Sequence, residues 1–329
     1  MTEILVTGET LIDFLPDGNA DLVDTETFHR RAGGAPANVA VGLARLGEPP
    51  LFWTRLAEDP LGDHLAATLT ENDVRPDLIE RDPEADTTLA FVSLDPDADR
   101  AFSFHRHGTA DTRLRPGTVD DDTLAGVEWV HAGGVALADE PSRSATIDLL
   151  ERASGTDTVV SFDPNARPEL FEEDDLVTTC RRAFTLVDVV KASSEDLFPG
   201  LLDGVDADPA RADPTVLARG ICDQGPHTAL VTRGPDGAVA HATPAAPWNP
   251  RDETLVVDHP GYDADTVDTT GAGDAFTAGA IRSLADEESL ETALGFANAV
   301  AAQSTTAKGA MAALPVRETV DRFRERRGD

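Results

Sequence analysis

The stretch of this chain best suited to chemistry is Asp268-Thr-Thr-Gly-Ala-Gly-Asp274. Its small residues Gly271, Ala272 and Gly273 let the backbone turn sharply and approach a ligand closely. A helical pattern follows, and a helix start offers unpaired N–H groups and a positive dipole end to an anion. Asp274 is placed beside that anion to take a proton from an attacking hydroxyl. The stretch therefore predicts a phosphoryl-transfer site.

A plainer interpretation of the same stretch is a tight loop followed by an acid that only complements the helix dipole. Two familiar nucleotide motifs are excluded. No Gly-Lys-Ser/Thr follows, so the stretch is not a P-loop, and Phe276 stands where a dinucleotide fingerprint needs its last glycine. The rest of the chain has to decide between these interpretations.

Composition narrows the class of protein. The chain has 329 residues with 27 Lys and Arg against 61 Asp and Glu, a net charge of −34. Such a charge repels nucleic acids and anionic lipid, so neither is expected as a partner. The acid is spread along the whole chain, which suggests the solvated surface of a halophilic protein. Cys180 and Cys222 have no local His partner and indicate neither a zinc site nor a disulfide framework.

No signal peptide is visible, and no run of about 18 apolar residues suggests a membrane span. A cytoplasmic protein is expected. Short apolar runs alternate with amphipathic segments along most of the chain, which predicts a doubly wound α/β fold with a mostly parallel sheet. The expected strands are 4–7, 51–56, 129–132, 158–162, 187–190 and 229–232. The expected helices are 36–46, 63–70, 143–153, 175–184, 214–222, 272–284, 289–305 and 315–326.

Two further segments, 87–94 and 101–106, alternate apolar and polar residues and read as strands outside that rhythm. Ligands of open parallel sheets bind beyond the carboxyl ends of the strands. That rule gathers distant loop residues into one predicted site, because each lies at a strand end or a helix start. The gathered residues are Asp13, Gly33, Gly34, Asn38, Arg106, Asp163, Asn165, Arg167, Lys191, Thr232, Gly234 and Asp274.

Each of these residues has a chemical interpretation and a structural one. Asn38 carries a donor and an acceptor that suit sugar hydroxyls, but it could simply cap a helix. Asp13 could accept two hydroxyl hydrogen bonds or be a loop acid. Arg106 could bind a sugar or a substrate anion or be an edge-strand arginine. Turn formation is the structural alternative for Asn165 and Thr232.

Read in order, the motifs resemble the ribokinase-like (PfkB) family of sugar and nucleoside kinases. The run from Gly33 to Gly47, GGAPANVAVGLARLG, is similar to the N-terminal signature of that family. Asp268 to Phe276, DTTGAGDAF, is similar to its C-terminal signature. The resemblance extends from Ile4 to Pro315 and favours the phosphoryl-transfer interpretation of the opening stretch.

The resemblance implies a large α/β core with a small β lid that closes over the sugar. The core is expected to comprise residues 1–9, 32–85 and 111–329, and the lid residues 10–31 and 86–110. This assignment accounts for the two alternating segments that the parallel sheet does not need. Lids of relatives often pair between subunits, so a homodimer through the lid is expected.

The resemblance also implies roles for individual residues. Asp274 matches the catalytic base, and the amides from Gly271 to Gly273 match the anion hole. The positions that match sugar or substrate contacts are Asp13, Gly33, Gly34, Asn38, Arg106, Asn165 and Arg167. The positions that match nucleotide contacts are Lys191, Ser193, Thr232, Gly234, Gly237 and Asn298. The cofactors implied are ATP and Mg²⁺, with the metal held mostly by phosphates and water.

The chain departs from the family pattern at one place. Many members carry Asn-x-x-Glu near the metal and phosphate site, whereas this chain has Ser193-Ser-Glu-Asp196. Asp196 stands at the acid position with Glu195 beside it, so either acid is a candidate for indirect support of the metal.

Three stretches favour a fructokinase-like enzyme that makes fructose 6-phosphate: Gly8 to Phe14, Ser161 to Arg167 and Val190 to Ser193. The alternative is a 2-keto-3-deoxygluconate kinase, whose acidic substrate would need cationic contacts from Arg106 and Arg167. A non-enzymatic alternative is a catalytically silent sugar or nucleotide sensor, but a sensor has no need for the base Asp274.

Overall fold

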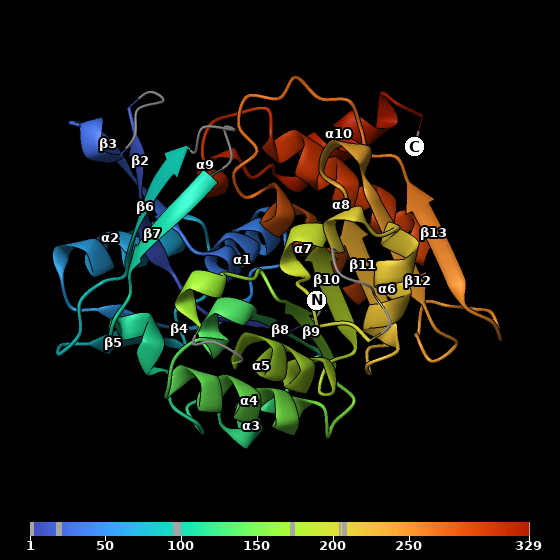
Figure 1. The fold of residues 1–329 in the computed structure, drawn as a ribbon, viewed down its shortest axis with the longest axis horizontal. Coiled ribbons are helices and arrows are strands. Elements are labelled where there is room, and N and C mark those ends of the chain that lie inside the picture. The colour runs from blue at the N-terminus through green and yellow to red at the C-terminus, as the bar shows by residue number, and fades with distance from the viewer. Residues whose placement is uncertain are drawn as a thin grey trace.

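The computed structural model describes residues 3–17, 22–94, 100–171, 175–203, 205 and 209–328. Its centre is a sheet of nine strands in the order β13-β12-β11-β10-β9-β8-β1-β4-β5 (Figure 1). The strands are β1 Ile4–Thr7, β4 Leu51–Ala57, β5 Ile79–Asp82, β8 Trp129–Gly133, β9 Val159–Asp163, β10 Val189–Ser193, β11 Thr228–Thr232, β12 Ala238–Ala242 and β13 Leu255–His259. This confirms the predicted doubly wound α/β class.

Helices cover both faces of this sheet, as alternate burial along β1 shows. Ile4 and Val6 pack into one core and Leu5 into the other. The first core is closed by α1 Ala35–Arg45, α7 Ala272–Ala285, α8 Leu290–Ser304, α9 Ala310–Ala313 and α10 Arg317–Glu325. The second is closed by α3 Asp121–Leu124, α4 Ser142–Ala153, α5 Asp175–Phe184 and α6 Pro214–Cys222. The remaining helix, α2 Pro60–Glu71, packs on β4 beside the lid.

The two strands at one edge of the sheet are a feature that the sequence pattern missed. β12 runs antiparallel to β11, and β13 runs antiparallel to β12, whereas β11 and its neighbours in the middle of the sheet are parallel. β12 is rich in alanine, which is a weak strand former, so its pattern does not mark a strand. β12 becomes a strand because its backbone forms hydrogen bonds with β11. No helix in the described part of the chain is long and apolar enough to cross a membrane.

A second sheet of four strands stands over one end of the large sheet (Figure 1). Its order is β3-β2-β6-β7, with β2 Leu11–Pro16, β3 Phe28–Gly33, β6 Leu89–Leu94 and β7 Arg100–His105. The β2–β6 pair is parallel and the other two pairs are antiparallel. This small sheet is the predicted lid. Parts of the ranges expected for it, 18–21 and 95–99, lie outside the described residues.

The alternation of side chains along the lid strands gives the two faces of the lid different surroundings. Leu11 and Asp13 of β2 and Phe102 and Phe104 of β7 line the cavity below the lid. The alternate residues point the other way, where Ile12 is buried against Leu56 and Leu65 of the core. The lid therefore presents a polar and aromatic inner face to the space above the large sheet.

Candidate active site

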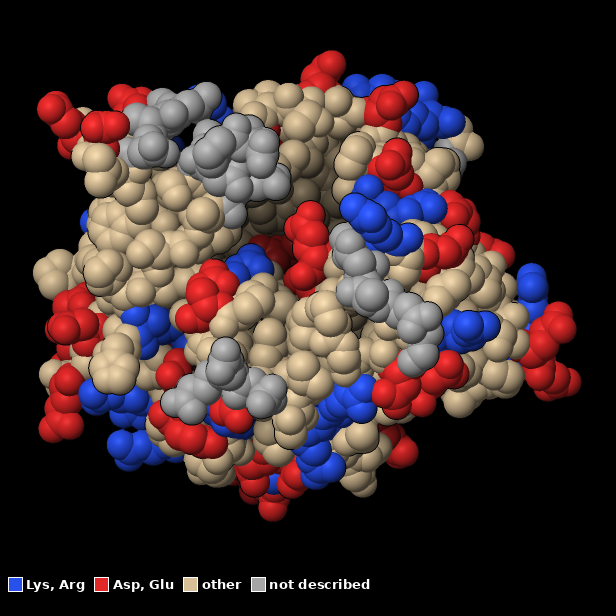
Figure 2. Space-filling model, in the orientation of Figure 1, with Lys and Arg blue, Asp and Glu red and all other residues tan. Residues whose placement is uncertain are grey.

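A cavity of about 1170 Å³ lies between the lid and the carboxyl ends of the large sheet. Figure 2 shows this face of the molecule hollowed at that place, with acidic side chains around the opening. The cavity brings together most residues that the sequence predicts for the site. Those that line it are Asp13, Gly34, Asn38, Asn165, Arg167, Lys191, Ser193, Glu195, Asp196, Thr232, Gly234, Gly237, Gly271, Ala272, Gly273, Asp274 and Asn298.

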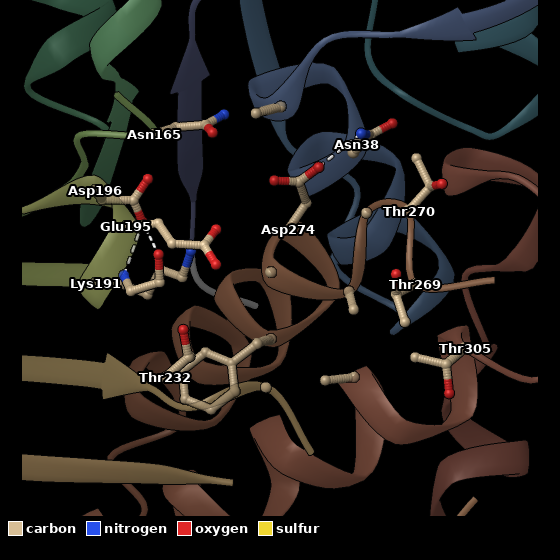
Figure 3. Close-up of a pocket in the computed structure, with 18 of the residues that line it drawn as sticks. Asn38, Asn165, Lys191, Glu195, Asp196, Thr232, Thr269, Thr270, Asp274 and Thr305 are labelled. Atoms are coloured by element: carbon tan, nitrogen blue, oxygen red, sulfur yellow. Dashed lines mark hydrogen bonds between the residues drawn. The ribbon is translucent and has the colours of Figure 1, made fainter. Parts of the chain in front are cut away.

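Asp274 stands in the first turn of α7 and points into the cavity (Figure 3). Its Oδ2 accepts a hydrogen bond of 2.6 Å from Nδ2 of Asn38 on α1. Burial raises the pKa of Asp274 to about 7, although the hydrogen bond from Asn38 and the charge of Lys191 act in the opposite direction. A carboxylate with such a pKa is suited to accept a proton near neutral pH.

The backbone before Asp274 forms the anion cradle, but not with every amide that the motif suggests. Gly271 caps α7 at φ 75°, a left-handed conformation that favours glycine. The N–H of Ala272 donates to the carbonyl of Thr269 at 3.2 Å, so it is already used in the turn. Among the described residues, the N–H groups of Gly271, Gly273 and Asp274 have no such acceptor. These three amides are the ones open to an anion.

Asp268 fixes the cradle from behind. Its Oδ1 accepts from the N–H of Thr270 at 3.0 Å, and its Oδ2 accepts from the N–H of Gly309 at 2.9 Å. A side chain at Gly271 would meet Cβ of Ala310 at 2.8 Å, so the loop before α9 closes directly over the turn. The acid at the start of the motif is therefore structural, whereas the acid at its end faces the cavity.

Lys191 is buried and lines the cavity. Among the described residues of the cavity wall, it is the one lysine. Its Nζ forms an ion pair of 2.9 Å with Asp163 at the end of β9. Burial alone would lower the pKa of Lys191, but the charges of Asp163 and Asp196 raise it, so the ammonium stays protonated. A side chain on Gly273 would meet this Nζ at 3.1 Å, which places the cation directly against the anion cradle.

The two acids of the Ser193-Ser-Glu-Asp196 departure have different surroundings. Asp196 is buried, and its carboxylate accepts from the N–H and the hydroxyl of Ser193 at 2.7 and 2.8 Å and from the N–H of Ala166 at 3.2 Å. Glu195 is exposed and lines the cavity (Figure 3). Asp196 thus holds two loops together, and Glu195 is the acid with oxygens turned to solvent.

The sugar side of the cavity is built where the lid joins α1. Asp13 lies so close over Gly33 that a side chain there would meet Oδ2 of Asp13 at 2.1 Å. Gly33 thereby shapes the site without lining the cavity. Oδ1 of Asn38 is buried with no hydrogen-bond partner and is available to a ligand hydroxyl. Arg167 packs over the ring of Phe102 from the lid, 5.3 Å from its centroid.

Arg106, which was expected to contact the substrate, is held by two carboxylates in this structure. Its Nε pairs with Asp111 and its Nη1 with Asp139, each at 2.7 Å, and its side chain is almost completely buried. It lines a second pocket of about 710 Å³ rather than the main cavity. Because two carboxylates already hold this guanidinium outside the main cavity, its contact with the substrate stays a prediction.

The nucleotide side of the cavity lies beyond β11. Gly237 follows a tight turn in which a side chain would meet the carbonyl oxygen of His259 at 2.0 Å, so only glycine fits. Asn298 on α8 is buried and uses its Nδ2 to donate to the carbonyl of Leu294 at 2.8 Å. Opposite it lie residues that the sequence analysis did not assign: Tyr262, Asp263, Ala264, Thr266 and Thr305. They lie in segments without a motif, so only the fold brings them to this wall.

Glu9 is another lining residue that the sequence analysis left without a role. It follows β1 directly, and its Oε1 accepts from the N–H of Ala35 at the start of α1 at 3.1 Å. Its position one residue beyond a strand-end glycine was a signal of the same kind that singled out Asp13.

Comparison with known proteins agrees with this geometry. A family model described as pfkB family carbohydrate kinase matches residues 1–317. The chain is 36% identical to the fructokinase of Klebsiella pneumoniae over 97% of its length and 98% of that protein. It is 37% identical to a probable chloroplastic fructokinase-6 of Arabidopsis thaliana, covering 95% of this chain and 80% of that one.

Among solved structures, an ATP-bound fructokinase of Xylella fastidiosa superposes with a TM-score of 0.84 at 31% identity, covering 99% of both chains. A fructokinase of Vibrio cholerae with fructose, ADP and calcium superposes with a TM-score of 0.80 at 32% identity, covering 98% of this chain and 99% of that one. The fold and the site define a phosphotransferase that acts on an alcohol group. The chain belongs to the pfkB family of carbohydrate kinases.

Proposed function

We propose that the protein is an ATP-dependent fructokinase that transfers the γ-phosphoryl group to fructose and forms fructose 6-phosphate. The single observation that carries the proposal is Asp274, which faces the cavity beside open backbone amides and a buried lysine. The fructokinases among the relatives, at 36% and 37% identity, support fructose as the acceptor.

The reaction follows from the placement of these groups. Asp274 accepts the proton of the sugar hydroxyl as its oxygen attacks the γ-phosphorus of ATP, and the bond to the β-phosphate oxygen breaks. Asn38 holds the carboxylate through its hydrogen bond to Oδ2, so the other oxygen, Oδ1, is the one that faces the hydroxyl. The open amides of Gly271, Gly273 and Asp274 and the ammonium of Lys191 stabilise the charge that develops on the transferred group.

Mg²⁺ is proposed to enter with ATP. Metal-ligand clusters of three or more His, Cys, Asp or Glu are absent from the described residues, which suits an ion held mainly by phosphates and water. Glu195 fits as the acid that supports the ion through water, because its carboxylate is exposed at the cavity wall. Asp196 fits less well, because Ser193 and Ala166 occupy its oxygens. When bound, the ion supplies positive charge to the phosphates.

The charges on the sugar side favour a neutral sugar over 2-keto-3-deoxygluconate. Glu9, Asp13 and Asp274 line that side, whereas Arg106 is held elsewhere by its own carboxylates. Among the described cations that line the cavity, Lys191 is paired with Asp163 and Arg167 packs on Phe102. A substrate carboxylate would therefore meet more acid than base at this wall.

Turnover with a substrate panel tests the proposal. The enzyme is incubated with Mg-ATP in molar KCl and with fructose, 2-keto-3-deoxygluconate, ribose or adenosine, and ADP release is followed. Fructose is expected to give the highest kcat/KM. Turnover of the keto acid alone would replace fructose with the sugar acid, and absence of turnover with all four would favour the silent sensor.

A homodimer through the lid is also proposed. The outer lid face carries a cluster of partly exposed rings in which Phe14 stacks on Phe91 at 5.0 Å and Phe28 meets Phe91 edge-on at 5.5 Å. Exposed aromatic clusters of this kind often mark protein interfaces. Light scattering at several protein concentrations would show a dimer, and a monomer throughout would refute it. Phe91→Ser should shift the protein towards monomer.

We further infer that the protein works in a salt-rich cytoplasm. The net charge of −34 implies strong repulsion between surface carboxylates at low ionic strength. Unfolding midpoints should rise from low to molar KCl. Midpoints that do not rise with salt would contradict the inference.

A further inference from the structure

Four short segments connect the lid to the core: residues 8–10, 34–35, 83–88 and 106–109. We call them the hinge. The third and fourth are tied to the core by the half-buried Asp59 and the buried Asp111. Thr87 donates through its N–H to Asp59 at 2.9 Å. Arg106 pairs with Asp111, to which Thr88 also donates. The lid therefore rests on a network of buried polar contacts rather than on apolar packing alone.

Two side chains of the hinge are left incompletely satisfied. Oε2 of Glu9 and Nη2 of Arg106 are both buried, and neither has a hydrogen-bond partner among the described residues. Glu9 is 3% exposed and Arg106 5% exposed, so solvent does not replace the missing partners. A buried polar atom without a partner is costly, and the cost is greater for a charged group.

The two unsatisfied groups are of opposite charge and lie on two of the four hinge segments. The charge of Arg106 lowers the pKa of Glu9, although burial is the larger effect and raises it to about 7. They do not form a direct ion pair in this arrangement: Arg106 pairs with Asp111 and Asp139 only. A hinge movement that brings the two free atoms together would satisfy both groups at once.

A shift that joins Glu9 and Arg106 would also move the lid, because both residues lie on segments that connect the lid to the core. Glu9 lies on the segment that leads into the first lid strand, and Arg106 lies just after the last. Glu9 lines the main cavity, whereas Arg106 lines the second pocket, which Asp59, Thr87 and Phe104 also border. The two residues of the pair thus line the two cavities on either side of the hinge.

Glu9 also connects the hinge to the reacting groups. Its Oε1 holds the N–H of Ala35, and α1 begins there. Asn38, in the first turns of the same helix, donates to the catalytic base. A lid position that is set at Glu9 is therefore transmitted over a short stretch of chain to the sugar site.

We propose that Glu9 and Arg106 are a positioning pair whose free atoms, Oε2 and Nη2, come into direct contact when the lid closes over the sugar. Closure then gains a buried ion pair, and the bound sugar keeps the lid in that position. The pair acts through the lid and does not take part in proton transfer. The proposal rests on the proposed sugar-kinase function for its link to substrate binding.

Steady-state kinetics with fructose and Mg-ATP test the pair. Glu9→Gln keeps an oxygen for Ala35 but removes the charge, and Arg106→Lys keeps the charge but cannot reach all its partners. Each substitution is expected to raise KM for fructose about tenfold, the effect of losing roughly 1.4 kcal/mol. KM for ATP and kcat should change little, because the cradle is untouched.

The double variant separates a pair from two independent contacts. If the two groups meet on closure, Glu9→Gln with Arg106→Lys should raise KM for fructose about tenfold, no more than either single change. A rise of about a hundredfold, the product of independent effects, would overturn the proposal. An unchanged KM for fructose in both single variants would overturn it as well. Glu151→Gln is the matched control, because Glu151 pairs with Arg182 on the exposed surface far from the lid.

Hydrogen exchange of the sugar-free protein keeps the proposal testable if fructose is the wrong substrate. A protein samples its closed form without ligand, so loss of the pair should let the amides of β2 and β6 exchange faster. The expected result is faster lid exchange in Glu9→Gln and Arg106→Lys, with the amides of α7 unchanged and Glu151→Gln like the wild type. Uniformly faster exchange across the molecule would show a general loss of stability and would refute a lid-specific role. Failure of the substrate panel alone would refute only the proposed function.

Discussion

The anion cradle and the lid are built in opposite ways. The cradle is one run of chain, Asp268 to Asp274, whose amides and carboxylate are fixed by the start of a helix and by Asp268 behind it. The lid stands on four separate segments, and its hinge holds charged groups without complete partners. The cradle is preorganised for charge, and the lid is free to respond to the sugar. The difference indicates that phosphoryl transfer and sugar selection are carried by separate parts of the molecule.

The comparison predicts that changes in the cradle lower kcat and that changes at the lid raise KM for the sugar. The largest effect is expected for Asp274→Asn, because the amide cannot accept the proton. It should reduce kcat by about 10²- to 10⁴-fold while ATP binding, measured by calorimetry, stays near normal. Asp286→Asn at the other end of α7 is the control, since its partner is Arg282 and it lies outside the cavity. A nearly active Asp274→Asn enzyme would remove Asp274 as the base.

Gly271→Ala should give the next largest loss. Gly271 has φ 75°, and an added side chain would meet Cβ of Ala310 at 2.8 Å, so the cradle has to shift. Displacing an anion-binding amide is expected to lower kcat by about a hundredfold with little change in KM for fructose. Gly117→Ala is the matched control, because Gly117 has φ 78° but no atom near the added carbon. Equal losses in both variants would mean that backbone strain alone explains the effect.

Asp13→Asn tests whether a residue of the lid acts on binding of the sugar. The carboxylate faces the cavity from β2, and removal of its charge weakens its bonds to sugar hydroxyls. KM for fructose should rise about 10- to 100-fold while kcat with saturating sugar falls less. Steady-state kinetics decide the outcome, with Asp24→Asn on the exposed part of the lid as control. A loss confined to kcat would place Asp13 with the cradle instead.

The smallest expected effect is the dependence of kcat on pH. It distinguishes the cradle, which contains Asp274, from the hinge, which contains Glu9. Burial raises the pKa of Asp274 to about 7, and only its ionised form accepts a proton. Log kcat should therefore fall below pH 7, with about a tenfold loss between about pH 8 and about pH 6. Glu9→Gln should keep this acid limb, because Glu9 acts on KM. A limb that vanishes in Glu9→Gln would assign it to the hinge rather than to the base.

Several elements could be predicted because their signals are local. The helix 214–222 and most strand positions follow from short periodic runs, and the structure places them within a few residues of expectation. Asp274 and its glycines form a contiguous motif, so their presence in one cavity was predictable. β12 was missed, because its strand character comes from pairing with β11 rather than from its alanine-rich composition.

Other roles could not be predicted, because they depend on what else lies nearby. Arg106 could be seen as a cation at a strand end, but not as one already held by Asp111 and Asp139. Ala272 belongs to the motif, yet its amide is used by Thr269. Asp196 and Glu195 are neighbours in sequence. Only the fold shows that Asp196 accepts hydrogen bonds within the loops and that Glu195 is exposed.

The sequence by itself determined the class of fold and predicted the anion cradle and the base, because the cradle and the base lie in one short motif and the fold class follows from local periodic runs. Only the tertiary structure decided which charges remain available to a ligand. Burial and ion pairing depend on segments that are far apart in sequence, as Lys191 with Asp163 and Arg106 with Asp139 illustrate. The chemical step can therefore be inferred from a motif, whereas the hold on the sugar is a property of the folded lid.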